Sequence, residues 1–510
     1  MRGAIAAGHP LTARAGADVL EAGGNAVDAA IAASAASWVA EGPLTGPGGG
    51  GFLLVHRARE QRTTLYDFFT AVPGGLAAVP MEEIVVDFSG GSTQAFRIGH
   101  ASVAVPGVVP GLEAAHRAYG SLPWRELFAP AIALARGGLV MARGQAYLHE
   151  ILDPILRLTP ESRRLFERDG GPLREGDGFA LPDLADTMER LAERGAEELR
   201  TGDLARALAH EVRSGGGAVT EDDLARFRPI RRRPVTAPFR GCDFRSNPPP
   251  SAGGVLLTYG LRLLDRGELG DPGTAEAICR LVEAMREQAH VRDRRFARDL
   301  HRGGLAGRLS GQDALEAAWA RLQAGSATPR EALIPGGTTH ISVVDAEGNA
   351  ASLSVSTGSG SGVVVAGTGI QLNNMLGEFE PEATLRPGMR MTSGMSPSVA
   401  LRDGEVRLVL GSAGSARLRN AVFQGTVNGL GHGLGVEDAI GRPRVHVEGE
   451  LVHVEGGHDP AALDALPYEL VRWREQNLYF GGVSAVEHLP DGSLAAAGDP
   501  RRGGHGIVVE

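Results

Sequence analysis

The stretch Gly336-Gly337-Thr338-Thr339-His340-Ile341-Ser342-Val343-Val344-Asp345 decides how the whole chain is interpreted. A Gly pair runs into a Thr pair and then into an apolar, β-branched run, which is typical of a buried strand. Turn-forming residues follow up to Asn349, and residues 350–356 have the pattern of a second strand. The stretch therefore predicts a β-hairpin.

Thr338 gains an unusual chemistry if the peptide bond before it is cut. Cleavage between Gly337 and Thr338 would place a free α-amine beside the hydroxyl of the same residue. An α-amine has a pKa of about 7.7–8.0, so it can act as base to that hydroxyl near neutral pH. The same residues also fit an ordinary strand with a flexible glycine lead-in. The rest of the chain has to decide between these interpretations.

Composition limits the classes of function. The chain has 510 residues, of which 43% are hydrophobic and 22% charged, as expected for a soluble globular protein with a large core. The formal net charge of −10 argues against nucleic acid and anionic membranes as partners. No apolar run is long enough for a membrane span or an export signal. We therefore expect a cytoplasmic protein that binds neither nucleic acid nor a membrane.

Several common mechanisms and cofactors are excluded by the residues themselves. The sequence has no Lys, so Schiff-base lysines and Ser–Lys dyads are absent. The two cysteines, Cys242 and Cys279, make neither a disulfide framework nor a metal-binding pair, and we expect no metal and no cofactor. Residues 46–51 match a dinucleotide-binding glycine spacing, but a helix precedes them and a strand follows, the reverse of such a site. We expect this loop to lead into a buried strand beside the functional site.

The order of predicted elements favours layered α/β architecture with sheet packed on sheet over βαβ winding. Residues 11–21 and 26–39 are predicted to be helices, the second Ala-rich and capped by Asn25. Residues 274–298 are predicted to form one long helix, and residues 303–335 a polar, exposed segment in which a chain break could be tolerated. Further strands are predicted at residues 52–55, 64–69, 362–366, 370–373, 398–401, 406–410, 445–447 and 451–454.

Short stretches along nearly the whole chain carry a resemblance to a known family. They are GGNAVDAA at 23–30, GGGGF at 48–52, VPG at 105–107, PPPSAGG at 248–254, TTH at 338–340, GI at 369–370 with NN at 373–374, MSP at 395–397, and GDPRRGG at 498–504. Taken in this order, they resemble the γ-glutamyltransferase (γ-glutamyltranspeptidase) family of N-terminal-nucleophile hydrolases. Each motif alone is weakly specific, whereas the ordered set is strongly so.

The resemblance implies a four-layer αββα sandwich made as one self-cleaving precursor. Cleavage before Thr338 would give a large subunit of residues 1–337 and a small subunit of residues 338–510, which stay associated as partners. The residues suit this chemistry, because Gly337 leaves its carbonyl unshielded to attack by the Thr338 hydroxyl. Thr338 would then serve as nucleophile and, through its freed amine, as base.

The resemblance also implies that the substrate is a small-molecule amide or peptide. Its acyl group would be transferred to water or an amine, as in a γ-glutamyltransferase or glutathione hydrolase. An oxyanion hole is expected from the turn at residues 411–415, with Gly414 matching the family and Ser415 standing where a second Gly is usual. Ser356 takes the place of a second threonine that supports the nucleophile. His340 is expected to support the strand and not to act as general base.

The residues that would bind the glutamate part of a donor depart from the family pattern. Phe69 stands where the family has an arginine, and a phenylalanine cannot bind a carboxylate. Glu378 replaces an aspartate, and Ser393 keeps one serine of a pair. Gly358 replaces an asparagine, and Gly394 replaces the other serine. We expect the reactive groups to be kept and recognition of the donor to be changed.

Two alternatives to a γ-glutamyl donor remain open at this point. The first is an amidohydrolase or acylase of the same family with another acyl group, for example an oxamate-like or glutaryl-like one, which the residues at 69 and 358 favour. The second is a scaffold that keeps the fold without activity. Retention of Thr338, Ser356 and Gly414 argues against the scaffold. The sequence does not decide between water and an amine as the acceptor. It also leaves open how the two subunits assemble further.

Overall fold

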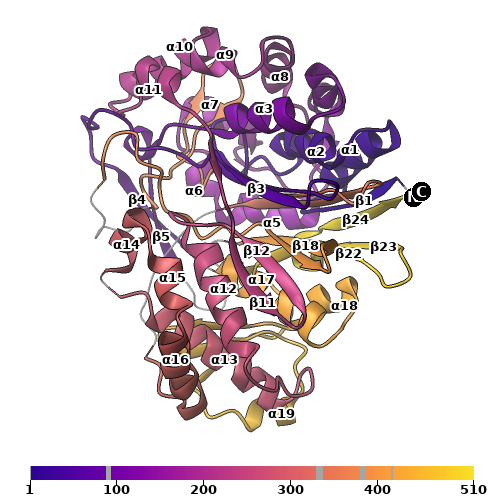
Figure 1. The fold of residues 1–510 in the computed structure, drawn as a ribbon. Coiled ribbons are helices and arrows are strands. Elements are labelled where there is room, and N and C mark those ends of the chain that lie inside the picture. The colour runs from indigo at the N-terminus through magenta and orange to yellow at the C-terminus, as the bar shows by residue number, and fades with distance from the viewer. Residues whose placement is uncertain (1, 88–92, 294, 329–336, 379–384, 415–416) are drawn as a thin grey trace.

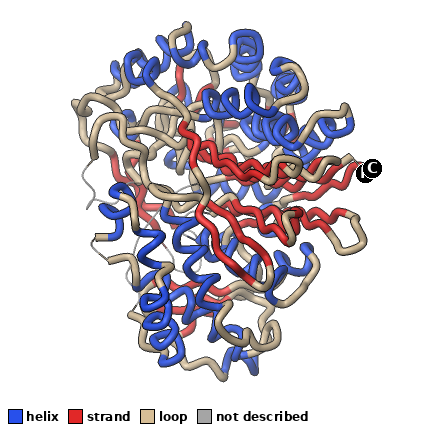
Figure 2. The backbone as a smooth tube through the Cα atoms, in the orientation of Figure 1, coloured by secondary structure: helices blue, strands red, loops and turns tan. Residues whose placement is uncertain are grey.

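The computed structural model describes residues 2–510 except 88–92, 294, 329–336, 379–384 and 415–416. It is a mixed helix-and-sheet structure in which two large sheets lie face to face in the middle of the molecule (Figures 1 and 2). Strands of one sheet contact strands of the other, and helices pack on the outer side of each sheet. The sequence-based expectation of sheet packed on sheet is therefore confirmed.

The predicted hairpin lies at the centre of the first sheet. Its two strands are β13 (Thr339–Asp345) and β14 (Ala350–Ser356). The second has the bounds that the sequence predicted, and the first begins one residue later than expected, at Thr339. The N-terminal strand lies between β13 and the C-terminal strand, and the two chain ends lie side by side (Figure 1). The seven-stranded, antiparallel sheet has the order β10 (Ile230–Arg232), β3 (Arg62–Asp67), β2 (Gly50–Arg57), β14, β13, β1 (Gly3–Ala7) and β24 (His505–Val509).

The second sheet packs against the back of this hairpin. Two side chains of the hairpin donate hydrogen bonds to the backbone of the second sheet. Ser342 Oγ donates to the Ser484 carbonyl at 2.9 Å, and Ser352 Oγ donates to the Leu410 carbonyl at 3.2 Å. The six strands have the order β11 (Val235–Phe239), β12 (Cys242–Ser246), β17 (Ser398–Arg402), β18 (Glu405–Ala413), β22 (Gly482–His488) and β23 (Leu494–Gly498).

The helix that covers the hairpin is α2 (Ala26–Ala40), and all of its residues are buried. The Asn25 side chain accepts from the backbone N–H of Val27 and Asp28, and the Asp28 side chain accepts from the Asn25 N–H, so the predicted cap is confirmed. Small Ala side chains let this helix lie close to the sheet. Other helices on this side are α1 (Pro10–Glu21), α3 (Val108–Tyr119), α4 (Ala129–Gly137), α5 (Arg143–Ile151), α6 (Asp153–Leu156), α7 (Pro160–Phe166), α8 (Pro182–Arg194), α9 (Glu197–Arg200), α10 (Asp203–Ser214) and α11 (Glu221–Arg226).

Two predictions for the helices on the outer side of the second sheet were wrong. The single helix at 274–298 is two helices, α13 (Ala275–His290) and α14 (Phe296–Arg302). The predicted exposed segment carries α15 (Leu305–Leu309) and α16 (Gln312–Ala324), because Leu315, Ala318 and Leu322 recur at helical spacing and are buried. Residues 329–335 of that segment lie outside the described residues. The remaining helices here are α12 (Ala252–Leu264), α17 (Leu418–Thr426), α18 (Val436–Gly441) and α19 (Pro460–Asp464).

Short strands complete the described structure. The predicted strands at 362–366 and 370–373 shrink to a two-stranded unit of β15 (Val364–Val365) and β16 (Ile370–Gln371). Within the described residues, no helix combines the length and apolar character needed to cross a membrane. The other short strands are β4 (Glu82–Asp87), β5 (Thr93–Ile98), β6 (Leu139–Val140), β7 (Glu167–Arg168), β8 (Gly171–Pro172), β9 (Gly178–Phe179), β19 (Val445–Glu448), β20 (Leu451–Val454) and β21 (Leu470–Arg472).

Candidate active site

The bond between Gly337 and Thr338 lies at the entrance to β13. Thr338 is only 4% exposed, and the Gly337 N–H donates to the Gly358 carbonyl at 2.8 Å. A Cβ at position 337 would lie 2.6 Å from the Gly358 carbonyl oxygen and 2.8 Å from Leu44 Cδ2. The site therefore fits glycine and no larger residue before the threonine.

Ser356 holds the carbonyl of that bond. Its hydroxyl donates a hydrogen bond to the Gly337 carbonyl oxygen and accepts one from the Gly358 N–H at 2.8 Å. The resemblance had implied a hydroxyl that supports the nucleophile, and the structure places this hydroxyl on the carbonyl of the bond that the sequence predicts to be cut. A donor on a carbonyl oxygen stabilises the negative charge that develops when the carbon is attacked.

A buried carboxyl group, missed from the sequence, anchors the residue after the nucleophile. Glu41 is 2% exposed and follows α2 directly. Its Oε2 accepts from Thr339 Oγ1 at 2.6 Å, and its Oε1 accepts from Thr12 Oγ1 at 2.8 Å. Burial raises the pKa of the Glu41 carboxyl above its usual value. An acidic residue directly after an Ala-rich helix and before a glycine loop was the available signal.

His340 is buried between the two sheets. Its Nδ1 lies 2.8 Å from Ser354 Oγ and its Nε2 lies 3.0 Å from Ser342 Oγ. Burial lowers the pKa of this imidazole to about 3, so the ring is neutral near pH 7. The ring connects the hairpin strands through hydroxyl groups.

The turn expected at residues 411–415 is shorter than predicted. Gly411, Ser412 and Ala413 belong to β18 and pair with β22, so this part of the prediction was wrong. The glycine at 411 serves packing, because a Cβ there would lie 2.3 Å from the His340 ring. Gly414 follows with φ of +126°, a conformation that favours glycine. Ser415 lies outside the described residues.

A cavity joins Gly337 to Gly414. These two residues and Ser359 form part of its lining, together with the side chains of Arg417 and Arg502. The rest of the wall is apolar and comes from segments far apart in sequence, including α5 and the short helix η5 (Leu478–Phe480). Its apolar and aromatic residues are Leu44, Phe96, Leu148, Ile151, Leu152, Leu478 and Tyr479.

Phe69 lies in the core and does not line this cavity. Its ring stacks on Phe52 with centroids 5.3 Å apart and planes inclined by 18°. It is 3% exposed and belongs to a cluster that includes Met375, Met391 and Met395. The position at which the family pattern has a carboxylate-binding arginine is therefore filled by hydrophobic packing.

Gly358 and Glu378 lie together beside the Gly337–Thr338 bond. A Cβ at position 358 would lie 2.0 Å from Asn374 Oδ1 and 2.5 Å from Glu378 Oε1, and φ there is +74°. Glu378 Oε1 accepts from the Ser359 N–H at 3.0 Å. Burial raises the pKa of the Glu378 carboxyl well above its usual range. This carboxyl group therefore supports the turn and resists ionisation.

Ser393 and Gly394 are held at the start of α12 and are absent from the described lining of the cavity. The Ser393 carbonyl accepts from the Ala252 N–H and from Ser251 Oγ, both at 2.9 Å. Its hydroxyl accepts from the Met395 N–H at 3.1 Å. The Gly394 carbonyl oxygen would lie 2.1 Å from a Cβ at Gly253, so the two segments touch through their backbones.

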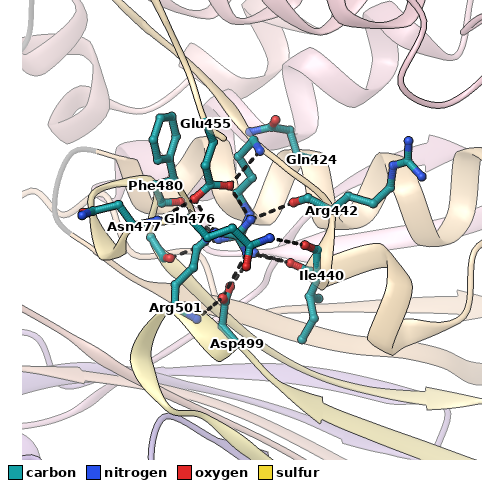
Figure 3. A network of polar contacts seen from close by, with 12 residues as sticks. Gln424, Ile440, Arg442, Glu455, Gln476, Asn477, Phe480, Asp499 and Arg501 are labelled. Carbon is teal, nitrogen blue, oxygen red and sulfur yellow. Dashed lines mark hydrogen bonds and ion pairs between the residues drawn. The ribbon is translucent and has the colours of Figure 1, made fainter. Parts of the chain in front are cut away.

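The C-terminal GDPRRGG motif forms a buried network of charges (Figure 3). Arg501 donates to Glu455 Oε1 at 2.7 Å, to Asp499 Oδ1 at 3.1 Å and to two backbone carbonyl groups. Asp499 also accepts from Arg444 and from the Val483 N–H. This network fixes the backbone beside β22 and so positions the next residue, Arg502, at the cavity.

Metal ligation has no basis in the described residues. No group of three or more His, Cys, Asp or Glu side chains there is arranged to hold a metal ion.

The chain is similar to known proteins over nearly its whole length. The gamma-glutamyltranspeptidase family model matches residues 12–509. The chain is 30% identical to the glutathione hydrolase proenzyme of Escherichia coli, over 98% of this chain and 90% of that protein. It is 31% identical to the acylase ACY 1 proenzyme of Pseudomonas sp. strain SE83, over 100% of this chain and 94% of that protein.

A solved structure extends the similarity to three dimensions. The crystal structure of cephalosporin acylase from Bacillus halodurans matches with a TM-score of 0.85 and 25% identity, covering 99% of this chain and 95% of that one. The family match over residues 12–509 includes the Gly337–Thr338 junction and the glycine loop at residues 46–51, whose last two residues pair with β14. The chain belongs to the γ-glutamyltranspeptidase family of N-terminal-nucleophile hydrolases, whose members include both glutathione hydrolases and acylases.

Proposed function

We propose that this chain is a self-processing threonine amidohydrolase that cuts itself between Gly337 and Thr338. The products would be a large subunit of residues 1–337 and a small subunit of residues 338–510, joined in a four-layer αββα sandwich. The observation that carries the proposal is the hydrogen bond from Ser356 to the Gly337 carbonyl, directly beside the buried Thr338.

The cut would proceed by transfer of an acyl group from nitrogen to oxygen. The Thr338 hydroxyl oxygen adds to the Gly337 carbonyl carbon, and Ser356 stabilises the oxygen that becomes negative. The C–N bond then breaks, and the proton from the hydroxyl passes to the released nitrogen. Water hydrolyses the resulting ester, leaving a carboxylate on Gly337 and a free amine on Thr338.

The processed enzyme would use the same hydroxyl on an amide substrate. The Thr338 amine takes the hydroxyl proton and returns it to the leaving nitrogen, while Gly414 and Ser415 supply backbone N–H donors to the oxyanion. Removal of one such donor typically costs about 10²–10³ in rate. Water or an amine then releases the acyl group from Thr338.

A γ-glutamyl amide, as in glutathione, is the first candidate donor because of the family and the glutathione hydrolase relatives. Glu378 and Ser393 are the polar groups that the resemblance retains for its recognition, although neither is among the described lining residues of the cavity. An acylase with another donor is the second candidate, and a specific observation favours it. Phe69 is packed on Phe52 in the core, and the cavity at the scissile bond has mainly apolar walls.

The decisive experiment follows the integrity of the chain. Purified protein should give two bands on a denaturing gel, and mass spectrometry should find Thr338 as a new N-terminus. Thr338→Ala should leave one band, whereas Thr338→Ser should still be cut because it keeps a hydroxyl group. An active wild-type protein with an unbroken chain would refute the proposal, and an uncut, inactive one would support the scaffold.

A further inference from the structure

The residue after the proposed nucleophile is held by a carboxyl group from a distant part of the chain. Thr339 Oγ1 donates to Glu41 Oε2 at 2.6 Å, and Glu41 Oε1 accepts from Thr12 Oγ1 at 2.8 Å. Gly8 makes room for this contact, because a Cβ there would lie 2.5 Å from Glu41 Oε2 and 3.0 Å from Thr339 Oγ1. All three side chains are buried, so the contact has a single, well-defined geometry.

The contact lies where β13 loses one of its neighbours. On one side, β1 pairs with β13 only as far as Ala7, which lies opposite Ile341. On the other side, the pairing with β14 continues to Thr339, which lies opposite Val355. The first few residues of a chain fray unless other contacts tie them down. The Glu41 carboxyl group therefore gives the start of β13 a second attachment.

The proposed cut would remove the other attachments of Thr338. The Gly337 N–H donates to the Gly358 carbonyl at 2.8 Å, and the Ser356 hydroxyl donates to the Gly337 carbonyl. Both bonds are made by Gly337, so after cleavage they would hold the end of the large subunit and no longer hold Thr338. The nucleophile would then be joined to the protein covalently only through Thr339.

The carboxyl group that holds Thr339 is itself firmly supported. Glu41 directly follows α2, and its N–H donates to the Ser37 carbonyl at 2.8 Å. Its carbonyl accepts from the Leu44 N–H at 2.9 Å, and the Leu44 carbonyl accepts from the Thr357 N–H at 3.1 Å. Glu41 would belong to the large subunit and Thr339 to the small one. A rigid part of the first would thus hold the new end of the second.

We propose that Glu41 is a positioning residue of the processed enzyme, which holds the new amino end through Thr339 and so keeps the Thr338 hydroxyl aligned with the substrate amide. The inference rests on the proposed function, because it needs the free end that the cut creates. Small misplacements of reacting groups can cost about 10²-fold in rate. Loss of the contact should therefore affect turnover more than the cut, during which Thr338 is still bonded on both sides.

The first measurement compares self-cleavage with turnover in the full-length Glu41→Ala variant. Self-cleavage should go on at close to the wild-type rate, whereas kcat should fall at least about tenfold with little change in KM. The donor is whichever of γ-glutamyl and glutaryl p-nitroanilide the wild type hydrolyses faster. Glu41→Gln should recover most of kcat. Burial raises the pKa of the Glu41 carboxyl, and a carboxamide of the same shape can bond to both threonines.

The partner residue provides the second variant. Thr339→Val should lower kcat about as much as Glu41→Ala, and the double variant should be little worse than either, because both changes break the same hydrogen bond. Thr187→Val is the matched control, since its buried hydroxyl donates to the Thr368 carbonyl at 2.8 Å in another part of the chain. Fully additive losses in the double variant would overturn the inference, as would an equal loss of kcat in Thr187→Val.

Amide hydrogen exchange supplies a measurement that needs no substrate. In the cut protein, Glu41→Ala should speed exchange in the peptide that begins at Thr338 by about tenfold or more. In the uncut Thr338→Ala background the same change should have a much smaller effect, because Gly337 still ties the strand. Equal effects in cut and uncut chains would show a purely structural role and overturn the inference. If Glu41→Ala does not fold, Thr339→Val carries the same comparison.

The outcomes separate this inference from the proposed function. An uncut wild type refutes both. A cut wild type whose Glu41→Ala variant keeps its kcat and its amide protection overturns the inference and leaves self-processing intact. A folded Glu41→Ala protein that no longer cuts itself also overturns the inference, because it would place the role of Glu41 before the cut.

Discussion

The hydroxyl of Ser356 donates a hydrogen bond to the carbonyl oxygen of Gly337 in the uncut chain. Ser356 is buried at the end of β14. The Gly358 N–H fixes the orientation of its hydroxyl group by donating to the Ser356 hydroxyl oxygen. The groups for the proposed first acyl transfer are therefore already in place in this structure.

Removal of that hydroxyl should slow the cut. Ser356→Ala leaves the Gly337 carbonyl without this donor, so we expect self-cleavage to be slower by about 10²–10³-fold, with Ser356→Thr much less affected. The measurement is the fraction of cut chain over time on denaturing gels. Ser310→Ala is a control, because its hydroxyl bonds only within its own helical turn. Cleavage of Ser356→Ala at the wild-type rate would remove Ser356 from the mechanism.

A side chain at position 337 should displace the Gly337–Thr338 bond that is proposed to be cut. The Cβ added by Gly337→Ala would lie 2.6 Å from the Gly358 carbonyl oxygen, so the backbone must shift. Because small misplacements of reacting groups can cost about 10²-fold, we expect cleavage to slow by at least about tenfold. Gly137→Ala is the matched control, since a Cβ there meets nothing within 4 Å. The same gel assay decides, and equal rates for the two variants would contradict this account.

Burial of His340 should make the fold sensitive to acid. Its pKa is lowered to about 3, so below pH 6.5 the unfolded chain binds a proton that the folded chain does not. The stability that neutral His340 contributes is complete above pH 6.5 and is lost as the pH falls toward 3. At pH 5 the loss amounts to about 2 kcal/mol of unfolding free energy. His340→Gln should lose correspondingly less unfolding free energy between pH 7.5 and pH 5.

That comparison is made by urea unfolding in a Thr338→Ala background, which is expected to keep one chain. His505→Gln, at an exposed position, is the control for removal of a histidine. If the proteins with His340 and with His340→Gln lose the same unfolding free energy between pH 7.5 and pH 5, the imidazole ring is not held neutral by burial.

The Asp499 carboxylate should be among the most important single groups for stability. It accepts from Arg444, from the Val483 N–H and from Arg501, all of which are buried. Asp499→Ala would leave two buried guanidinium groups without this partner, at a cost of about 3–5 kcal/mol. Urea unfolding in the single-chain background measures this. Asp491→Ala, whose carboxylate is exposed and bonds to Ser493, should change stability little.

Local patterns in the sequence predicted the elements nearest the chemistry. The hairpin at Thr339–Asp345 and Ala350–Ser356 was predictable because the first strand is rich in β-branched residues and turn-forming residues separate it from the second. The cap of α2 at Asn25 was predictable because its hydrogen bonds are local. Gly411 misled the prediction, because its glycine makes room for His340 in another sheet and does not mark a turn.

The cavity could not be predicted, because its wall is assembled from distant segments. Leu44, Leu148 and Leu478 are separated by about a hundred residues or more and meet only in the fold. Arg502 belongs to a motif that the sequence made visible, but only the fold shows that its Nε and Nη1 have no hydrogen-bond partner among the described residues. Glu41 was missed because its partners, Thr12 and Thr339, come from other elements.

The position of β1 has a consequence for a chain cut at residue 337. This strand belongs to the first fragment, yet both of its neighbours, β13 and β24, belong to the second. The other sheet is also shared, because β12 of the first fragment pairs with β17 of the second. The fragments are thus interleaved, and pulling them apart would strip β1 of hydrogen bonds along both edges. A nicked molecule should therefore melt as one cooperative body, without releasing either piece beforehand.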